Sequence, residues 1–180
     1  MLLTRKDCLK RYGSDYMIAK QVASGKLFRI EKGLWADQPS VPEQAVIAFK
    51  YPNAVLTMLS AFYYYGLTDV TPEIYDLATD RDAAKIRDER VHQVFIPGHF
   101  LKAGAETKNH QGYPIRIYDR ERMLIELLRN KSSLPYDLYK EILLNYRKIL
   151  PQLNMQKIQD YAMASPKSSA IMNALQTEVL

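Results

Sequence analysis

The chain has 180 residues, 47% of them hydrophobic, and a net charge of +5, which suits a globular protein of one or two small domains. It has no apolar run near the ~20 residues that a membrane-spanning helix requires, and its first residues lack the apolar segment of a signal peptide. We therefore expect no membrane partner. The single cysteine, Cys8, can form neither an internal disulfide nor a thiolate metal site alone, so we expect a cytoplasmic protein without a metal.

The excess positive charge lies in the first fifth of the chain. Residues 1–35 contain eight basic and three acidic residues, a net charge of +5, whereas residues 36–180 contain 17 of each. A local basic surface is typical of proteins that bind nucleic acids or anionic membranes, although a solvated charged face would have the same composition. The charge distribution therefore favours a basic binding region at the N-terminus.

A short helix is predicted at residues 4–12. Thr4 is a good N-cap residue, Asp7 stands three positions later as a capping-box partner, and Gly13 can end the helix. A second helix begins immediately afterwards, with Ser14 as its N-cap. The turn between the two predicted helices is therefore very short.

The second predicted helix ends at Gly25 and has two different faces. The apolar residues that fall near one face are Met17, Ile18 and Val22. The face predicted to be exposed carries Tyr16, Ala19, Lys20 and Ala23. The alanines on this face are small enough to let the helix approach a partner closely.

The segment KLFRIEKGLWA, residues 26–36, is predicted to form a two-stranded ribbon with Lys32 and Gly33 in its turn. Side chains alternate between the faces of a strand, so one face can pack while the other meets a partner. Leu27 and Phe28, with Leu34 and Trp35, can attach the ribbon to the helices. The cations can then project toward a phosphate backbone. Helix, tight turn, helix and ribbon is the layout of a winged helix-turn-helix domain, which we place at residues 1–38.

Double-stranded DNA is the partner that this layout predicts. The second helix of such a domain enters the major groove with its N-terminal residues leading, while the ribbon reaches the phosphates. The predicted DNA-binding residues are Arg5, Lys6, Ser14, Asp15, Tyr16, Lys20, Lys26, Arg29 and Lys32. The alternative is that the helices and the ribbon form only a charged packing unit.

A second domain is predicted at residues 45–180. It follows the segment DQPSVPEQ, residues 37–44, which has two prolines and a serine and is typical of a linker. Strands are predicted at 73–79, 91–96, 106–111 and 113–118, with a loop between Gly98 and Gly104. Helices are predicted at 43–50, before Gly66, in RERMLIELLRN, and throughout the chain after Pro135, with breaks at Pro151 and Pro166.

These elements predict an α+β protein. Its N-terminal winged helix-turn-helix is followed by a mixed α/β domain with a small sheet and a helical C-terminal tail.

Catalysis has one candidate cluster, formed by Glu73, Asp76, Asp80 and Asp82. A metal-dependent nuclease needs carboxylates near a strand to hold Mg²⁺, and the three aspartates share the parity of an extended segment. No convincing Glu-x-Lys pattern accompanies them, and a charged loop at a strand end explains the cluster equally well. The spacings of His92, His99 and His110 match no metal motif, and the common phosphate and nucleophile loops are missing. We therefore predict no enzyme and no cofactor.

Three segments of the sequence, in their order and spacing, resemble those of the AbiEi-family antitoxins of type IV toxin–antitoxin systems. The first is GSDYMIAKQVASGKLFRIEKGLW, with its pattern of Gly25, Leu27, Gly33 and Trp35. The second is YPNAVLTMLSAFYYYGL, with Ser60, Ala61, Gly66 and Leu67, and the third is GYPIRIYDRERMLIELL, which contains Asp119 to Leu128. The resemblance covers roughly residues 1–145.

The resemblance implies a transcriptional autorepressor that binds the operator of its own operon. Its C-terminal domain would counteract a nucleotidyltransferase-like toxin encoded beside it, without a need for a stable complex. Many such DNA-binding domains carry an additional helix before the first one found here, so either the domain is trimmed or a later helix or a second protomer covers the exposed side. The alternative functions are a stand-alone transcription factor with a ligand-sensing or assembly domain, and a nuclease that uses Asp76, Asp80 and Asp82.

Overall fold

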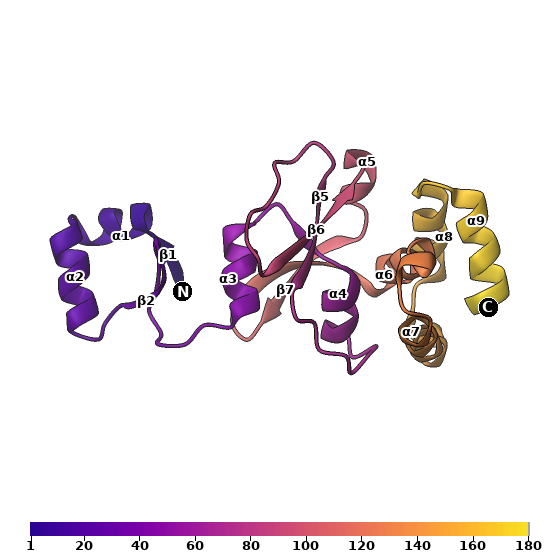
Figure 1. Ribbon diagram of the computed structural model, residues 1–180, viewed down its shortest axis with the longest axis horizontal. Coiled ribbons are helices and arrows are strands. Elements are labelled where there is room, and N and C mark those ends of the chain that lie inside the picture. Colours follow the sequence, from indigo (N-terminus) through magenta and orange to yellow (C-terminus); the bar gives the residue numbers. More distant parts are fainter. Residues whose placement is uncertain (180) are drawn as a thin grey trace. The chain divides into compact units, whose positions relative to one another are not determined.

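The computed structural model describes residues 1–179 and shows an α+β protein with two sheets and several helices (Figure 1). The chain divides into two compact units. We call Met1–Tyr51 with Asn109–Ile115 the N-terminal unit, and Pro52–Lys108 with Arg116–Leu180 the C-terminal unit. Among residues 1–179, no helix combines the length and the apolar character that crossing a membrane requires.

The N-terminal unit consists of a three-stranded antiparallel sheet, in the order β1-β3-β2, and three helices. Its elements are β1 (Leu2–Thr4), α1 (Arg5–Tyr12), α2 (Asp15–Ala23), β2 (Phe28–Glu31), β3 (Leu34–Ala36) and α3 (Glu43–Lys50). The two predicted helices and the ribbon are confirmed. Strand β1 was not predicted; it pairs Leu3 with Trp35 and makes the ribbon a sheet.

Local hydrogen bonds fix the start of α1 and the short turn between α1 and α2. Thr4 and Asp7 form the predicted capping box: the Asp7 amide donates to the Thr4 hydroxyl at 3.2 Å, and the Thr4 amide donates to the Asp7 carboxylate at 2.9 Å. The hydrogen bonds from Thr4 hold the pKa of Asp7 below its ordinary value. Gly13 takes φ +86°, which favours glycine, and Ser14 then caps α2.

The interior next to α1 and α2 is a small cluster of Leu3, Cys8, Ile18 and Leu27. Trp35 packs against it while remaining half-buried. Of the apolar residues predicted near one face of α2, Ile18 is 4% exposed and belongs to this cluster, whereas Val22 is 38% exposed.

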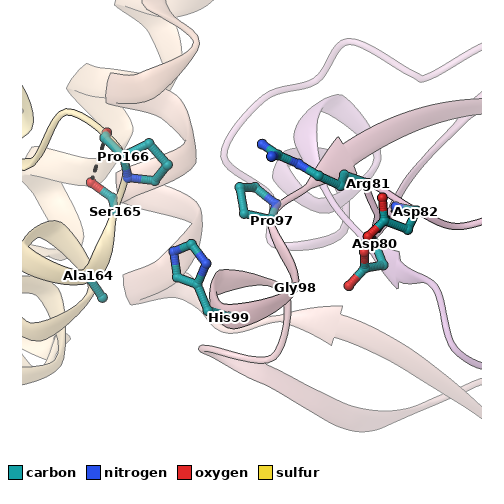
Figure 2. A pocket seen from close by; sticks show the side chains of 9 residues that line it. All are labelled: Asp80, Arg81, Asp82, Pro97, Gly98, His99, Ala164, Ser165 and Pro166. Atoms are coloured by element: carbon teal, nitrogen blue, oxygen red, sulfur yellow. Dashed lines mark hydrogen bonds between the residues drawn. The ribbon is translucent and has the colours of Figure 1, made fainter.

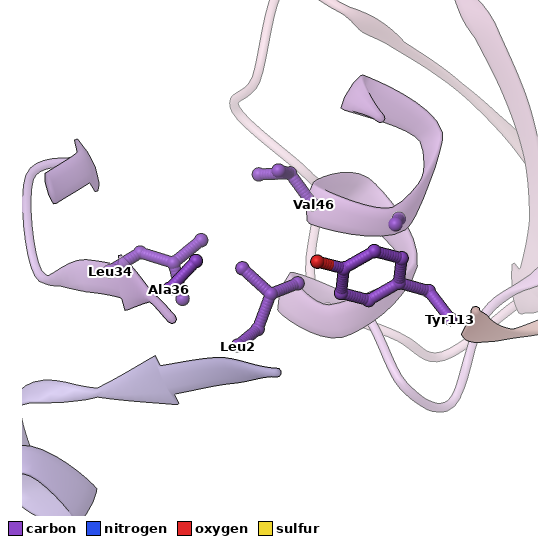
Figure 3. Packing of buried hydrophobic residues seen from close by; sticks show 6 residues of the cluster. Leu2, Leu34, Ala36, Val46 and Tyr113 are labelled. Carbon is purple, nitrogen blue, oxygen red and sulfur yellow. The ribbon is translucent and has the colours of Figure 1, made fainter. Parts of the chain in front are cut away.

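A second cluster places α3 in the N-terminal unit. Ala45 and Val46 of α3 are buried with Leu2, Leu34 and Ala36 of the three-stranded sheet (Figure 3). This contact extends the compact unit to Tyr51, beyond the predicted linker at residues 37–44. Helix α3 is thus a later helix that covers one face of the small sheet.

The same cluster includes Tyr113, which comes from a distant part of the sequence. It lies at the tip of the hairpin formed by β7 (Ala105–His110) and β8 (Tyr113–Tyr118), where Gln111 and Gly112 both have positive φ, as a two-residue hairpin turn requires. The predicted domain of residues 45–180 therefore contributes this tip to the N-terminal unit.

The larger sheet has five strands in the order β6-β5-β4-β8-β7. Strand β4 (Val55–Leu56) runs antiparallel to β5 (Tyr75–Asp80) and parallel to β8, while β5 and β6 (Val91–Ile96) are parallel. The predicted strands are confirmed. The segment predicted as a loop after Gly98 contains a short helix, α5 (Gly98–Leu101), because Pro97 presents its carbonyl to the next turn.

Helix α6 (Arg120–Arg129) is the central helix of the C-terminal unit. It contacts α4 (Met58–Tyr64) and three helices of the tail, α7 (Tyr136–Ile149), α8 (Met155–Ala164) and α9 (Ser168–Ala174). Met123, Leu124, Ile125 and Leu127 of α6 are fully buried. The predicted helical tail is confirmed.

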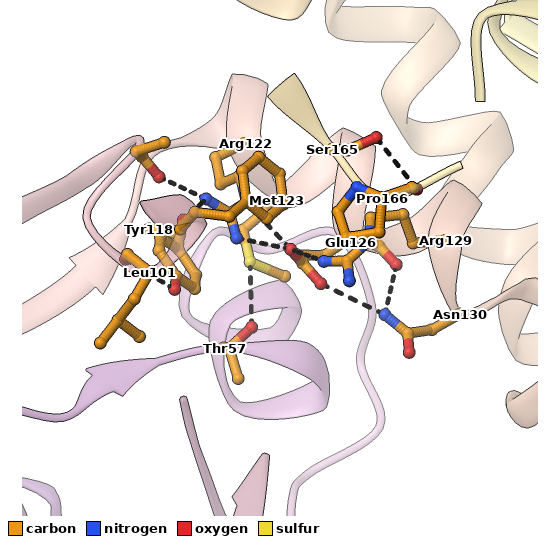
Figure 4. A network of polar contacts seen from close by, with 12 residues as sticks. Thr57, Leu101, Tyr118, Arg122, Met123, Glu126, Arg129, Asn130, Ser165 and Pro166 are labelled. Atoms are coloured by element: carbon orange, nitrogen blue, oxygen red, sulfur yellow. Dashed lines mark hydrogen bonds and ion pairs between the residues drawn. The ribbon is translucent and has the colours of Figure 1, made fainter. Parts of the chain in front are cut away.

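Helix α6 also buries an arginine completely. The Arg122 guanidinium lies 3.5 Å from the centroid of the Phe100 ring and 4.2 Å from that of Tyr118, and it donates to the carbonyls of Phe100 and Ala103 at 2.7 and 2.6 Å. Its Nε donates to Glu126 at 2.9 Å, and Arg129 contacts the same oxygen at 2.7 Å (Figure 4). The two guanidinium groups therefore share the single carboxylate of Glu126, and the carbonyls of Phe100 and Ala103 supply further acceptors for Arg122.

Candidate nucleic-acid interface

Helix α2 presents one open face. Tyr16 is 76% exposed, and Ala19, Lys20 and Ala23 are also exposed, whereas Ile18 on the opposite side is 4% exposed and belongs to the core. The prediction of an exposed face with small side chains is therefore confirmed for these residues. An α-helix with such a face can lie in the major groove of DNA.

Five of the predicted cations are exposed and have no carboxylate partner among residues 1–179. They are Lys6 of α1, Lys20 of α2, Lys26 before the ribbon, Arg29 of β2 and Lys32 in the ribbon turn. An unpaired exposed cation can exchange its counterions for a DNA phosphate without breaking a contact within the protein.

The ribbon cations Arg29 and Lys32 are exposed. Arg29 lies opposite Trp35 in the register of β2 and β3, and the pairing becomes irregular between Arg29 and Glu31. The only acidic residue of the ribbon, Glu31, forms an ion pair with Lys50 of α3 at 2.9 Å. Lys50 was not singled out from the sequence, because its partner lies 19 positions earlier in the chain. It offsets the one negative charge beside the ribbon cations.

Three of the predicted DNA-binding residues already have partners in the protein. The Ser14 hydroxyl accepts a hydrogen bond from the Met17 amide at 3.3 Å as the cap of α2. The Arg5 guanidinium binds the Asp15 carboxylate through two hydrogen bonds, Nε to Oδ1 at 3.1 Å and Nη2 to Oδ2 at 2.6 Å. Arg5 and Asp15 therefore join the first residues of α1 and α2.

The acidic cluster in the C-terminal unit does not form the metal site of the nuclease hypothesis. Asp76 and Asp80 are four residues apart on β5, which separates them by about 13 Å. Asp76 instead contacts Nδ1 of His92 at 2.7 Å, and Asp80 accepts from the Asp82 amide at 3.0 Å. Within residues 1–179, no three acidic, histidine or cysteine side chains are grouped so as to hold a metal ion. Asp76 is therefore not brought together with Asp80 and Asp82, as the nuclease alternative expected.

An open cleft of about 510 Å³ lies beside this region of the C-terminal unit. Its lining includes Asp80, Arg81, Asp82 and His99 on one side, and Ser165 with its neighbours from the turn after α8 on the other (Figure 2). The lining mixes both signs of charge and does not define one ligand chemistry. The basic surface of the N-terminal unit is therefore the better-defined candidate site.

Comparison with known proteins shows a likeness to a solved structure. No protein-family model matches the chain, and no curated protein matches it significantly. The chain is similar to the crystal structure of the Rv2827c protein from Mycobacterium tuberculosis, with a TM-score of 0.67 over 98% of this chain and 71% of that chain. At 14% sequence identity this likeness shows a shared fold and nothing about activity.

Proposed function

We propose that this chain is a DNA-binding transcriptional autorepressor whose N-terminal unit is a winged helix-turn-helix domain. The observation that carries this proposal is the set of five exposed cations without carboxylate partners among residues 1–179, gathered in the unit that also exposes one face of α2. In this proposal α2 enters the major groove, and the β2–β3 ribbon is the wing that contacts phosphates.

We further propose that the C-terminal unit acts as the antitoxin against a nucleotidyltransferase-like toxin encoded in the same operon. This part of the proposal depends on the resemblance to the AbiEi family. The alternative is a stand-alone transcription regulator whose C-terminal unit senses a ligand or mediates assembly. The open cleft of about 510 Å³ beside β5 and α5 supports that alternative.

The test separates the two activities in the full-length chain. A triple variant, Lys20→Ala, Arg29→Ala and Lys32→Ala, removes the proposed groove and wing cations, all of which are exposed. It should lose binding to the DNA upstream of its own gene. It should still protect cells when the neighbouring toxin is expressed from an unrelated promoter, because no residue of the C-terminal unit has changed.

A charge-matched variant controls for the loss of three cations. Lys85, Lys102 and Lys140 are exposed lysines of the C-terminal unit, and their replacement by alanine should leave DNA binding unchanged. Equal loss of DNA binding in both triple variants would contradict the proposed interface. A folded groove-and-wing variant that fails to protect would contradict the division of activities. Full-length protein that gives no protection from the toxin would favour the stand-alone regulator.

A further inference from the structure

We propose that Asp15 occupies the place of a DNA phosphate on Arg5 in the free protein, and that DNA binding transfers Arg5 from Asp15 to the phosphate backbone. This inference rests on the proposed function. It assigns to Asp15 the role of an internal competitor that limits the affinity of the N-terminal unit for DNA.

The geometry of the pair is that of phosphate recognition. Nε and Nη2 of Arg5 donate to the two oxygens of Asp15 at 3.1 and 2.6 Å, which is the parallel two-bond contact that a guanidinium also makes with a phosphate. A phosphate oxygen pair can therefore replace the carboxylate without a change in the donor groups that Arg5 uses.

The position of the pair places it at the proposed DNA contact. Arg5 is the first residue of α1 and Asp15 is the first residue of α2, the end of the helix that leads into the groove. In the free protein a carboxylate there interacts favourably with the helix dipole. Close to DNA the same carboxylate would be repelled by the phosphates unless a cation remained beside it.

Because the pair is exposed, separating Arg5 from Asp15 costs little free energy. The side chains of Arg5 and Asp15 are 59% and 63% exposed. Ion pairs at such exposed positions contribute little to stability, and salt screens them further. Arg5 can therefore leave Asp15 while the capping box of α1 and the Ser14 cap of α2 keep both helices in place.

Two full-length variants test this inference by DNA titration over a range of salt concentrations. In Asp15→Asn, Arg5 faces the phosphates without an internal anion, so binding should tighten several-fold at low salt. The slope of log K against log salt should stay as in the unaltered chain, because Arg5 contacts a phosphate in both complexes and only the cost of leaving Asp15 is removed. Adding Arg5→Gln to Asp15→Asn should remove this gain.

Asp137→Asn is a matched control. Asp137 is also an exposed aspartate in the first turn of a helix, α7, but it lies in the C-terminal unit. Its replacement changes the net charge by the same amount and should leave the affinity for DNA at low salt as in the unaltered chain. An equal gain from Asp137→Asn and Asp15→Asn would show a general charge effect and overturn the inference.

The NMR resonance of the Arg5 Nε–H group reports the transfer directly. Asp15→Asn should shift this resonance in the free protein and leave it unchanged in the DNA complex, where Arg5 has already left Asp15. An equal shift in both states would mean that the pair persists on DNA, which overturns the inference while leaving the proposed function intact. Absence of any DNA binding by the unaltered chain at low salt would instead remove the proposed function, and this inference with it.

Discussion

The two units treat their cations differently. In the C-terminal unit, Arg122 is fully buried and its charge is matched by Glu126, while Lys157 contacts Asp119 at 3.2 Å and Lys131 contacts Glu178 at 2.8 Å. In the N-terminal unit, seven exposed cations, including five of those predicted to bind DNA, form no ion pair with a carboxylate among residues 1–179. The C-terminal unit also leaves cations such as Lys85 and Lys140 exposed and unpaired, but acidic residues balance them in the sequence.

The difference shows why the net charge of a whole chain is a weak guide to function. Residues 36–180 contain as many cations as anions, and several of these cations are used within the fold. The more informative quantity is the local excess of cations over anions. That excess lies within residues 1–35, whereas residues 36–180 are balanced.

The largest expected effect is on the stability of the C-terminal unit. Arg122→Ala leaves Glu126 buried with Arg129 as its remaining cation, and it removes the donor for two backbone carbonyls. Breaking a buried pair in this way should cost about 3–5 kcal/mol in the free energy of unfolding, measured with urea. Arg81→Ala, at an exposed position, should change it by less than about 0.5 kcal/mol. Equal effects would contradict the assignment of Arg122 as a paired structural cation.

The next largest expected effect is on sequence discrimination, which we propose to depend on α2. Lys20 lies one turn after Tyr16 on the exposed face, where it can reach base edges. Lys20→Ala should therefore reduce discrimination between operator and unrelated DNA by about 1–3 kcal/mol. The measurement is a pair of titrations at one salt concentration. If both affinities fall by the same factor, Lys20 contacts only phosphate and α2 has been placed wrongly on the DNA.

A smaller change is expected from each cation of the ribbon. Arg29→Ala or Lys32→Ala should weaken binding to all DNA sequences about equally, because a phosphate contact carries no sequence information. Each should also flatten the plot of log K against log salt by about one unit. Lys140→Ala in the C-terminal unit is the matched control and should leave the plot unchanged. A ribbon variant that behaves like this control would remove the wing from the interface.

The smallest expected effect is the change in stability when the hydroxyl group of one of two buried tyrosines is removed. The Tyr113 hydroxyl is buried without a hydrogen-bond partner among residues 1–179, whereas the Tyr118 hydroxyl donates to the Leu101 carbonyl at 2.9 Å. Burial raises the pKa of Tyr118 to about 12, so its hydroxyl keeps its proton at neutral pH. Tyr113→Phe should leave stability unchanged or raise it by up to about 1 kcal/mol, and Tyr118→Phe should lower it by about 1 kcal/mol. If thermal unfolding showed that both substitutions lower stability, or that both raise it, the assignment of one unpaired and one hydrogen-bonded hydroxyl would be contradicted.

The helix pair could be predicted from the sequence because its signals are local. Thr4, Asp7, Gly13 and Ser14 determine the ends of α1 and the start of α2 within a few residues. Strand β1 could not be predicted, since three residues carry no periodicity and become a strand only by pairing with β3.

Packing between distant segments explains the remaining differences. The second cluster of the N-terminal unit brings Leu2, Val46 and Tyr113 together, and no local pattern relates these positions. Arg122 was likewise not singled out, because the groups that compensate its burial include carbonyls about 20 residues earlier. At the candidate site, the exposed face of α2 could be predicted from its periodicity, but the contact between Arg5 and Asp15 depends on how α1 and α2 meet.

The salt dependence of DNA binding by the unaltered full-length chain tests the central claim most directly. The five predicted DNA-binding cations that form no ion pair among residues 1–179 predict about five phosphate contacts, and hence a slope of log K against log salt of about −4 to −5. The measurement needs only a duplex that contains the DNA upstream of the gene and a series of salt concentrations. A slope in that range is the result that the account predicts. A slope near zero, or no binding at low salt, would contradict the claim that the unpaired cations of the N-terminal unit form a DNA-binding surface.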